Sequence, residues 1–256
     1  MELLVSVRCR AEVEAALSGG AQIIDAKEPA RGSLGPVSPD DLAGILAEVP
    51  GKHPVSVALG DWSQPERLGE AVACLPIPPR PASIFLKIGF AGVARPGEIE
   101  RLIATAAEVS SSQPASARIV AVAYADAERA GTPSPDIVID AAVRGGATGL
   151  LLDTYLKDGR SLPAWMSLSA LTRWVNRGRD SGLITALAGS LQLEDLGLVR
   201  ATGADVVGVR GAACEGGREG RVNSARVRAL RQRLEDSSGS LQGDKSAMPD
   251  CWSRNA

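Results

Sequence analysis

Residues 135–153 read PDIVIDAAVRGGATGLLLD and contain one complete passage from a helix to a strand. Pro135–Arg144 has the apolar spacing of a helix, whereas Gly149–Asp153 is a short apolar run typical of a buried strand. Between them, glycine at the helix end accepts the left-handed conformation and Ala147 begins the extended chain. The same joint recurs at Gly19-Gly20-Ala21 and Thr202-Gly203-Ala204. Its recurrence predicts a repeated α/β unit.

Working outward from this unit, strands and helices alternate along the chain. The predicted strands are Leu3–Val7, Gln22–Ala26, Val55–Leu59, Ile84–Ile88, Arg118–Ala123, Gly149–Asp153, Ile184–Ala188 and Asp205–Val209. The predicted helices are Ala11–Ser18, Pro39–Glu48, Gln64–Ala73, Pro96–Ser110, Pro135–Arg144, Ser167–Ser181, Gln192–Ala201 and Ser224–Glu235. An open, doubly wound sheet uses similar units but usually stops at five or six strands. Eight units predict a single (β/α)8 TIM barrel over residues 1–235.

Composition narrows the class of protein. The net charge of −2 and the 3% of aromatic residues give no sign of a nucleic-acid binder. No apolar stretch is long enough for a membrane span, and the chain begins with a strand pattern rather than a signal peptide, so we expect a cytoplasmic protein. Beyond Glu235 the composition predicts a disordered C-terminal tail, residues 236–256. Helices on the outside of a barrel offer assembly surfaces, so we also expect a homo-oligomer.

Metal and disulfide chemistry are not indicated. The four cysteines form no C-x-x-C pair and have no histidine nearby. The sole histidine, His53, precedes a strand and is expected at the barrel face opposite the active site. We therefore predict no metal and no cofactor, with a small molecule as the partner.

Chemistry in such barrels lies where the strands end. Only five of the 28 basic residues are lysines, yet Lys27, Lys87 and Lys157 all fall at or just beyond strand ends. An amine can lose its proton and attack a carbonyl, whereas a guanidinium stays protonated. Neighbouring ammonium groups lower one another's pKa and so favour the free amine. Any one of these lysines could instead be a phosphate binder or the salt-bridge partner of Asp25 or Asp153; the case for imine chemistry rests on the cluster.

Other polar residues follow the strand ends as well. They are Asp61 after the third strand and Tyr124 and Asp126 after the fifth. They belong with the lysines to the short list of strand-end positions at which the active site is expected.

The loops after the seventh and eighth strands predict an anion site. They contain Gly189-Ser190 and Gly208-Val209-Arg210-Gly211, and barrels often hold phosphate there with backbone N–H groups. Glycine lets the backbone approach closely, and Arg210 could add charge. We therefore expect Gly189, Ser190, Gly208, Arg210 and Gly211 to bind substrate phosphate. The glycine-rich run at 216–220 is read as a flexible connection rather than a flap.

The motifs together resemble those of a known family. Ile23-Ile24-Asp25-Ala26-Lys27-Glu28-Pro29 with Gly32-Ser33-Leu34-Gly35 is similar to the first signature of the (5-formylfuran-3-yl)methyl phosphate synthases. Later signatures are matched in order by Phe85-Leu86-Lys87-Ile88-Gly89, Leu151-Leu152-Asp153-Thr154, Lys157-Asp158-Gly159, Leu187-Ala188-Gly189-Ser190 and Gly208-Val209-Arg210-Gly211-Ala212. The resemblance spans residues 1–235 and does not extend to the proline-rich stretch 76–81 or the tail.

The resemblance implies an enzyme that condenses two molecules of glyceraldehyde 3-phosphate into a furan aldehyde phosphate, an early step of methanofuran biosynthesis. It implies that Lys27 forms the Schiff base and that Lys87 accepts protons. Asp153 and Lys157 would assist at the same centre, beside Asp25. It implies no metal or organic cofactor.

Three other readings remain open. A generic Schiff-base aldolase of sugar phosphates would use the same lysines but give an open-chain product instead of a ring that absorbs in the near ultraviolet. A lysine-free phosphosugar isomerase would need a glutamate or histidine base at a strand end, which this rim does not clearly offer. A barrel kept only as a phosphate-binding scaffold would form no imine.

Overall fold

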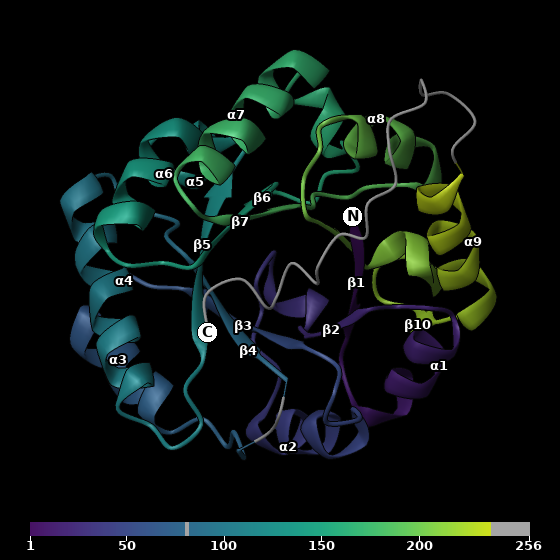
Figure 1. The fold of residues 1–256 in the computed structure, drawn as a ribbon, viewed down its shortest axis with the longest axis horizontal. Coiled ribbons are helices and arrows are strands. Elements are labelled where there is room, and N and C mark those ends of the chain that lie inside the picture. The colour runs from purple at the N-terminus through teal and green to yellow at the C-terminus, as the bar shows by residue number, and fades with distance from the viewer. Residues whose placement is uncertain (80–81, 237–256) are drawn as a thin grey trace.

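The computed structural model describes residues 1–79 and 82–236 and contains a closed barrel of eight parallel strands (Figure 1). The strands pair in chain order, and β1 closes the ring against β8. Their bounds are β1 Glu2–Val7, β2 Ile23–Ala26, β3 Val55–Asp61, β4 Ile84–Gly89, β5 Arg118–Tyr124, β6 Gly149–Asp153, β7 Ile184–Leu187 and β8 Val206–Val209. The predicted (β/α)8 barrel is confirmed, and no strand end lies more than two residues from its expected place.

A ring of helices surrounds the strands (Figure 1). The α-helices are α1 Val13–Ser18, α2 Pro39–Glu48, α3 Pro65–Ala73, α4 Pro96–Ser111, α5 Ala127–Ala130, α6 Pro135–Arg144, α7 Leu168–Asp180, α8 Leu196–Ala201 and α9 Ser224–Glu235. Short 3-10 helices are η1 Arg10–Glu12, η2 Pro29–Arg31, η3 Leu162–Ala164, η4 Leu193–Asp195 and η5 Gly211–Ala213. The single-turn helix α5 was not predicted, because four residues are too few to show a period.

The glycine joints behave as their sequence predicts. Gly20, Gly146 and Gly203 have φ of 98°, 78° and 77°, in the left-handed region that favours glycine. The first glycine of a pair serves another purpose. A Cβ on Gly145 would lie 2.7 Å from the Cβ of Ile103 on α4, so this position has to be small for α6 to pack against α4.

Side chains alternate in direction along each strand, and this divides the hydrophobic core into a layer between strands and helices and a layer inside the barrel. On β5, Ile119, Ala121 and Ala123 face the helices, whereas Val120 and Val122 point into the barrel. The barrel interior is therefore filled by side chains, and what remains open lies towards the strand ends.

The glycine-rich run at 216–220 is not a plain connection. It is the turn of a small antiparallel hairpin formed by β9, Cys214–Glu215, and β10, Arg221–Val222. The prediction of a flexible connection is therefore wrong. Two-residue strands are too short to show an alternating pattern, so the sequence held no clear signal for them.

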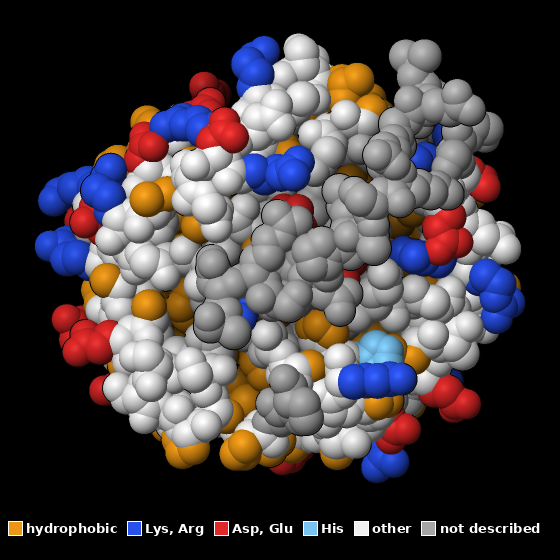
Figure 2. All heavy atoms as spheres, viewed as in Figure 1, with side chains coloured by type: hydrophobic (Ala, Val, Ile, Leu, Met, Phe, Trp, Pro, Cys, Tyr) orange, Lys and Arg blue, Asp and Glu red, His pale blue; other side chains and the backbone are white. Residues whose placement is uncertain are grey.

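Charged side chains of both signs are interspersed around the face drawn in Figure 2. No helix in the described ranges is long and apolar enough to cross a membrane. Residues 237–256, nearly all of the predicted tail, lie outside the described part of the chain.

Candidate active site

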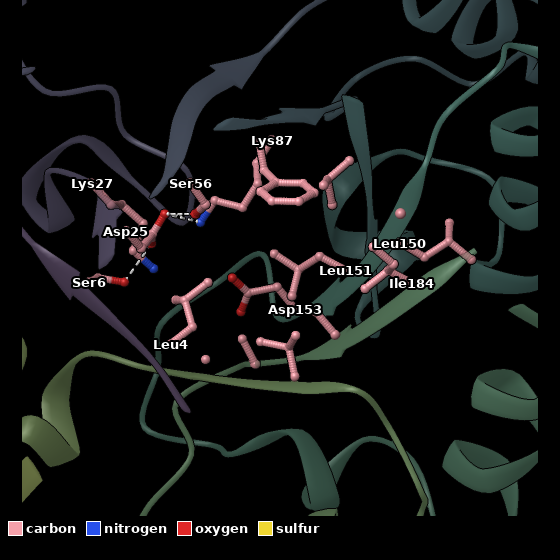
Figure 3. A pocket seen from close by; sticks show the side chains of 17 residues that line it. Leu4, Ser6, Asp25, Lys27, Ser56, Lys87, Leu150, Leu151, Asp153 and Ile184 are labelled. Carbon is pink, nitrogen blue, oxygen red and sulfur yellow. Dashed lines mark hydrogen bonds and ion pairs between the residues drawn. The ribbon is translucent and has the colours of Figure 1, made fainter. Parts of the chain in front are cut away.

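Asp25 forms the centre of a polar cluster inside the strand ends of β1 to β4 (Figure 3). Its carboxylate accepts hydrogen bonds from Ser6 Oγ at 2.7 Å and from Ser56 Oγ, and Lys87 Nζ lies 2.6 Å from Oδ1. Ser6, Asp25 and Ser56 are register partners on adjacent strands, which is why their side chains share one layer. The two serines were not predicted; their only signal was a polar residue at an inward position of an otherwise apolar strand.

Asp25 is fully buried yet stays charged. Burial acts to raise its pKa, but Lys87 and Lys27 outweigh that effect, so the pKa of Asp25 lies below its ordinary value. The hydrogen bonds from Lys87 and Ser56 act in the same direction. The cluster therefore holds the Lys87 ammonium in place with a fixed counter-charge.

Lys27, at the end of β2, differs from the other rim lysines. Its side chain is 7% exposed, and its Nζ makes no hydrogen bond or ion pair with any residue of the described ranges. Burial, together with repulsion from Lys87 and more weakly Lys157, lowers its pKa to about 7, although Asp153 and Asp25 partly oppose the shift. A substantial fraction of Lys27 is therefore a free amine at neutral pH.

Asp153 points into the same pocket from β6, on the side facing Asp25 (Figure 3). Its Oδ1 accepts from the Thr154 N–H at 2.7 Å and from Lys157 Nζ at 2.6 Å. Burial acts to raise the pKa of Asp153, but Lys157 and Lys27 lower it below its usual value. Lys157 also donates to the carbonyl and the hydroxyl of Thr154, so one of its three N–H groups is engaged by the carboxylate and the other two by Thr154.

Two adjoining cavities bring the predicted residues together. The inner one, about 40 Å³, is lined mainly by apolar side chains with Asp25, Lys27, Lys87 and Asp153 among them, and has room only for a few waters. The outer cleft, about 250 Å³, opens at the strand ends. It is lined by Lys27, Asp153, Lys157, Gly189, Ser190, Gly208, Arg210 and Gly211, among others. Every predicted site residue therefore borders one or both of these cavities.

The loop after β7 has the backbone expected of an anion site. Gly189 has φ of 112°, and a Cβ there would come within about 3 Å of Thr154, so the position requires glycine. Ser190 also has a positive φ, 51°, which is unusual for a residue with a side chain. Within the described residues, the N–H groups of Ser190 and Leu191 meet no protein acceptor. Backbone strain of this kind clusters at active sites and ligand-binding loops.

Arg210 does not fit its predicted role. Its guanidinium pairs with Glu12 at 2.6 and 3.1 Å and donates to the carbonyls of Ser6, Gly220 and Arg218. All five of its N–H groups are thus engaged inside the protein, and the side chain is 5% exposed. This geometry argues against the guanidinium as a phosphate ligand: it joins the loop after β8 to η1 instead.

The other polar residues at the strand ends hold loops rather than line the cavities. Tyr124 donates to Asp61 at 2.7 Å, and burial, followed by the Asp61 charge, raises the pKa of Tyr124 well above its usual value. Asp126 accepts from the N–H groups of Tyr155 and Leu156 and so fixes the start of the loop after β6. Within residues 1–79 and 82–236, no cluster of three histidine, cysteine or acidic side chains is placed to bind a metal ion.

The family model and the similar proteins of known name point to the same family. The family model of 4-HFC-P synthase matches residues 3–231. The (5-formylfuran-3-yl)methyl phosphate synthase of Methanopyrus kandleri is 36% identical over 238 residues, covering 91% of this chain and 98% of that protein. A putative (5-formylfuran-3-yl)methyl phosphate synthase of Kitasatospora aureofaciens is 37% identical over 217 residues, covering 83% and 85%.

A solved structure of 3-hexulose-6-phosphate synthase covers 91% of this chain and 99% of its own, with a TM-score of 0.61 and 16% identity. At that identity the likeness concerns the fold alone. The match over nearly the whole barrel, with both relatives above 30% identity, is what identifies the protein: this chain belongs to the (5-formylfuran-3-yl)methyl phosphate synthase family of enzymes.

Proposed function

We propose that this protein condenses two molecules of glyceraldehyde 3-phosphate into (5-formylfuran-3-yl)methyl phosphate through an imine on Lys27. One inorganic phosphate and two molecules of water are lost, which makes the enzyme a carbon–oxygen lyase, and the product belongs to methanofuran biosynthesis. Family membership supports the product. The observation that carries the imine is the burial of Lys27 with no partner on its Nζ among the described residues; this burial, together with repulsion from Lys87, lowers its pKa to about 7.

The first step is attack of the Lys27 amine on the aldehyde carbon. The carbinolamine that forms must lose water, which requires a proton on its oxygen. The Lys87 ammonium, held by Asp25 in the inner cavity, supplies that proton. Fixed in place at 2.6 Å from a buried carboxylate, it needs little reorganisation to act.

The imine then makes the hydrogen on the neighbouring carbon acidic. Lys87, neutral after the first step, accepts that proton, and the resulting enamine forms the carbon–carbon bond to the second aldehyde. Asp153 faces the same centre, and its negative charge stabilises the iminium on Lys27. Lys157 keeps that carboxylate charged and oriented.

Substrate phosphate binds at the loops after β7 and β8. Ser190 and Leu191, whose N–H groups meet no acceptor among the described residues, line the same cleft as Gly208 and Gly211. Backbone N–H groups in such loops are common phosphate ligands in barrels of this type. Phosphate held here leaves the aldehyde end of the substrate free to reach Lys27, which borders the same cleft.

The test is trapping with borohydride. We expect protein incubated with glyceraldehyde 3-phosphate and borohydride to gain a substrate-sized mass on the peptide that contains Lys27. Without reductant, absorbance of a furan aldehyde should rise in the near ultraviolet. An adduct without the chromophore would make the protein an ordinary sugar-phosphate aldolase. Absence of both would rule out the Lys27 imine for this substrate.

The pKa of Lys27 predicts the pH profile of imine formation. Only the free amine attacks an aldehyde, so the rate of trapping at low aldehyde concentration should rise with pH through about 7 and level off above it. An ordinary lysine, with a pKa near 10.5, would still be gaining rate at pH 9. The measurement is the initial rate of adduct formation under cyanoborohydride from about pH 5 to about pH 9. A rate that keeps rising tenfold per pH unit to the upper limit would contradict the lowered pKa.

A further inference from the structure

Arg218 occupies the turn of the β9–β10 hairpin and reaches across the rim. Its Nη2 donates to the carbonyls of Pro29, at 3.0 Å, and Gly32, both in the loop that follows Lys27. Its backbone lies against Gly211 in the loop after β8. One side chain thus connects the loop that carries the predicted nucleophile with a loop of the predicted phosphate site, and it lines the outer cleft between them.

The cations around this cleft are not equivalent. All N–H groups of the Lys157 ammonium donate to Asp153 and Thr154. All N–H groups of the Arg210 guanidinium donate to Glu12 and to three backbone carbonyls. Arg218 has no ion pair with a carboxylate of the described residues, and the hydrogens on its Nε and Nη1 meet no acceptor there. Apart from Lys27, the predicted nucleophile, Arg218 is therefore the cation that lines this cleft, among the described residues, with donors to offer a ligand.

Burial makes that unbalanced charge costly. Arg218 is half-buried, and burial, followed by repulsion from Arg210, lowers its pKa, although Asp153, Glu219 and Glu28 act in the opposite direction. An anion in the cleft would supply a counter-charge in direct contact with the guanidinium, which no carboxylate of the described residues does. A guanidinium fork matches the geometry of phosphate oxygens and binds them through two parallel hydrogen bonds.

We propose that Arg218 binds the phosphate group of the aldehyde that Lys27 captures. The proposal rests on the proposed function for the identity of the aldehyde, and it assigns to Arg218 the charge that the sequence led us to expect from Arg210. The backbone N–H groups of the loop after β7 approach the phosphate from one wall of the cleft, and Arg218 does so from the hairpin. This makes Arg218 a specificity residue that distinguishes phosphorylated from unphosphorylated aldehydes.

A second arginine cluster at the rim is less suited to this task. Arg129 and Arg160 both pair with Asp158 at 2.7 Å, and both lie over the ring of Trp165. Their charge is shared with a carboxylate, and neither lines the cleft that contains Lys27.

The experiment compares two aldehydes. Adduct formation on Lys27 is measured under cyanoborohydride, at subsaturating concentrations, with glyceraldehyde 3-phosphate and with unphosphorylated glyceraldehyde. In Arg218→Met we expect trapping of the phosphorylated aldehyde to fall about 10- to 100-fold, the effect of losing hydrogen bonds to a charged group, while glyceraldehyde is trapped at the parent rate. Arg218→Lys, which keeps the charge without the fork, should lie between. Arg221→Met, an exposed arginine of the same hairpin, is the matched control and should change neither rate.

Arg218 also connects two loops through its hydrogen bonds to Pro29 and Gly32. The experiment must therefore distinguish phosphate binding by Arg218 from a purely structural role. Loss of the tether would slow both aldehydes by the same factor, and that result would overturn the proposal. Binding of inorganic phosphate, followed by calorimetry, gives a reading that does not depend on the reaction. Arg218→Met should weaken it at least tenfold and Arg221→Met should not. If the parent protein traps neither aldehyde, the imine proposal fails, but the phosphate titration still tests the role of Arg218. Equal phosphate affinity in the parent and in Arg218→Met would refute phosphate binding by Arg218.

Discussion

Lys27→Arg is expected to abolish furan formation, with a loss on the order of 10⁴-fold or more, the scale seen when a covalent nucleophile is removed. Arginine keeps the positive charge and most of the side-chain length, but its guanidinium does not lose a proton at any working pH and cannot form the imine. The initial rate is followed by the rise in furan-aldehyde absorbance, and the adduct by peptide mass. Lys52→Arg, the same change at an exposed lysine before β3, should leave the rate unaltered.

Comparison with Lys87 sharpens this prediction. Because Lys87 carries protons in the proposed mechanism rather than forming the covalent bond, Lys87→Met should still yield some borohydride adduct on Lys27 while furan formation is lost. Folding of each variant is checked by circular dichroism, since Asp25 is left buried without its partner when Lys87 is removed. More than about one hundredth of the parent rate in Lys27→Arg would be incompatible with the Lys27 imine.

Arg210→Met is expected to destabilise the protein by about 3–5 kcal/mol, the usual cost of removing one partner of a buried ion pair. Glu12 and Arg210 are each 5% exposed, so the change leaves a carboxylate in the interior without its counter-charge. The carbonyls of Ser6 and Gly220 lose their donors as well. For a chain of this size the melting temperature should fall by about 10 °C.

Unfolding in denaturant measures the loss of unfolding free energy in Arg210→Met. Two further variants serve as comparisons. Arg10→Met removes an exposed partner of Glu48, paired at 3.5 Å, and should cost less than about 1 kcal/mol. The double variant Glu12→Gln with Arg210→Met should be destabilised by less than the sum of the single changes, because the two side chains contact each other. If Arg210→Met were as stable as the parent but failed to bind phosphate, the original expectation for Arg210 as a phosphate ligand would be correct after all.

The eight-stranded fold could be predicted from the sequence because the patterns that indicate its helices and strands are local. A helix period, a glycine joint and an apolar strand, as in residues 135–153, each lie within a few residues of one another. In a closed parallel barrel all strands end at one rim, so knowing where the strands stop is enough to place Lys27, Lys87 and Asp153 near one another. The cavities that these residues share agree with that reasoning.

The sequence could not show which side chains pair with residues far away along the chain. Arg210 follows a strand and looks like a phosphate ligand, yet it pairs with Glu12, which is 198 positions away along the chain. Arg218 lies in a run that reads as flexible, yet its hairpin turn aims it at Pro29. The small size of Gly145 is explained only by Ile103 on another helix.

Local pattern thus determined which elements form and at which rim the chemistry lies, because backbone propensity and strand alternation act over short range. The tertiary structure alone decided which cations are neutralised and which stay available. The reason is physical: a charge is satisfied by whatever group lies within a few ångströms of it in space, and that neighbour is set by the packing of the whole barrel.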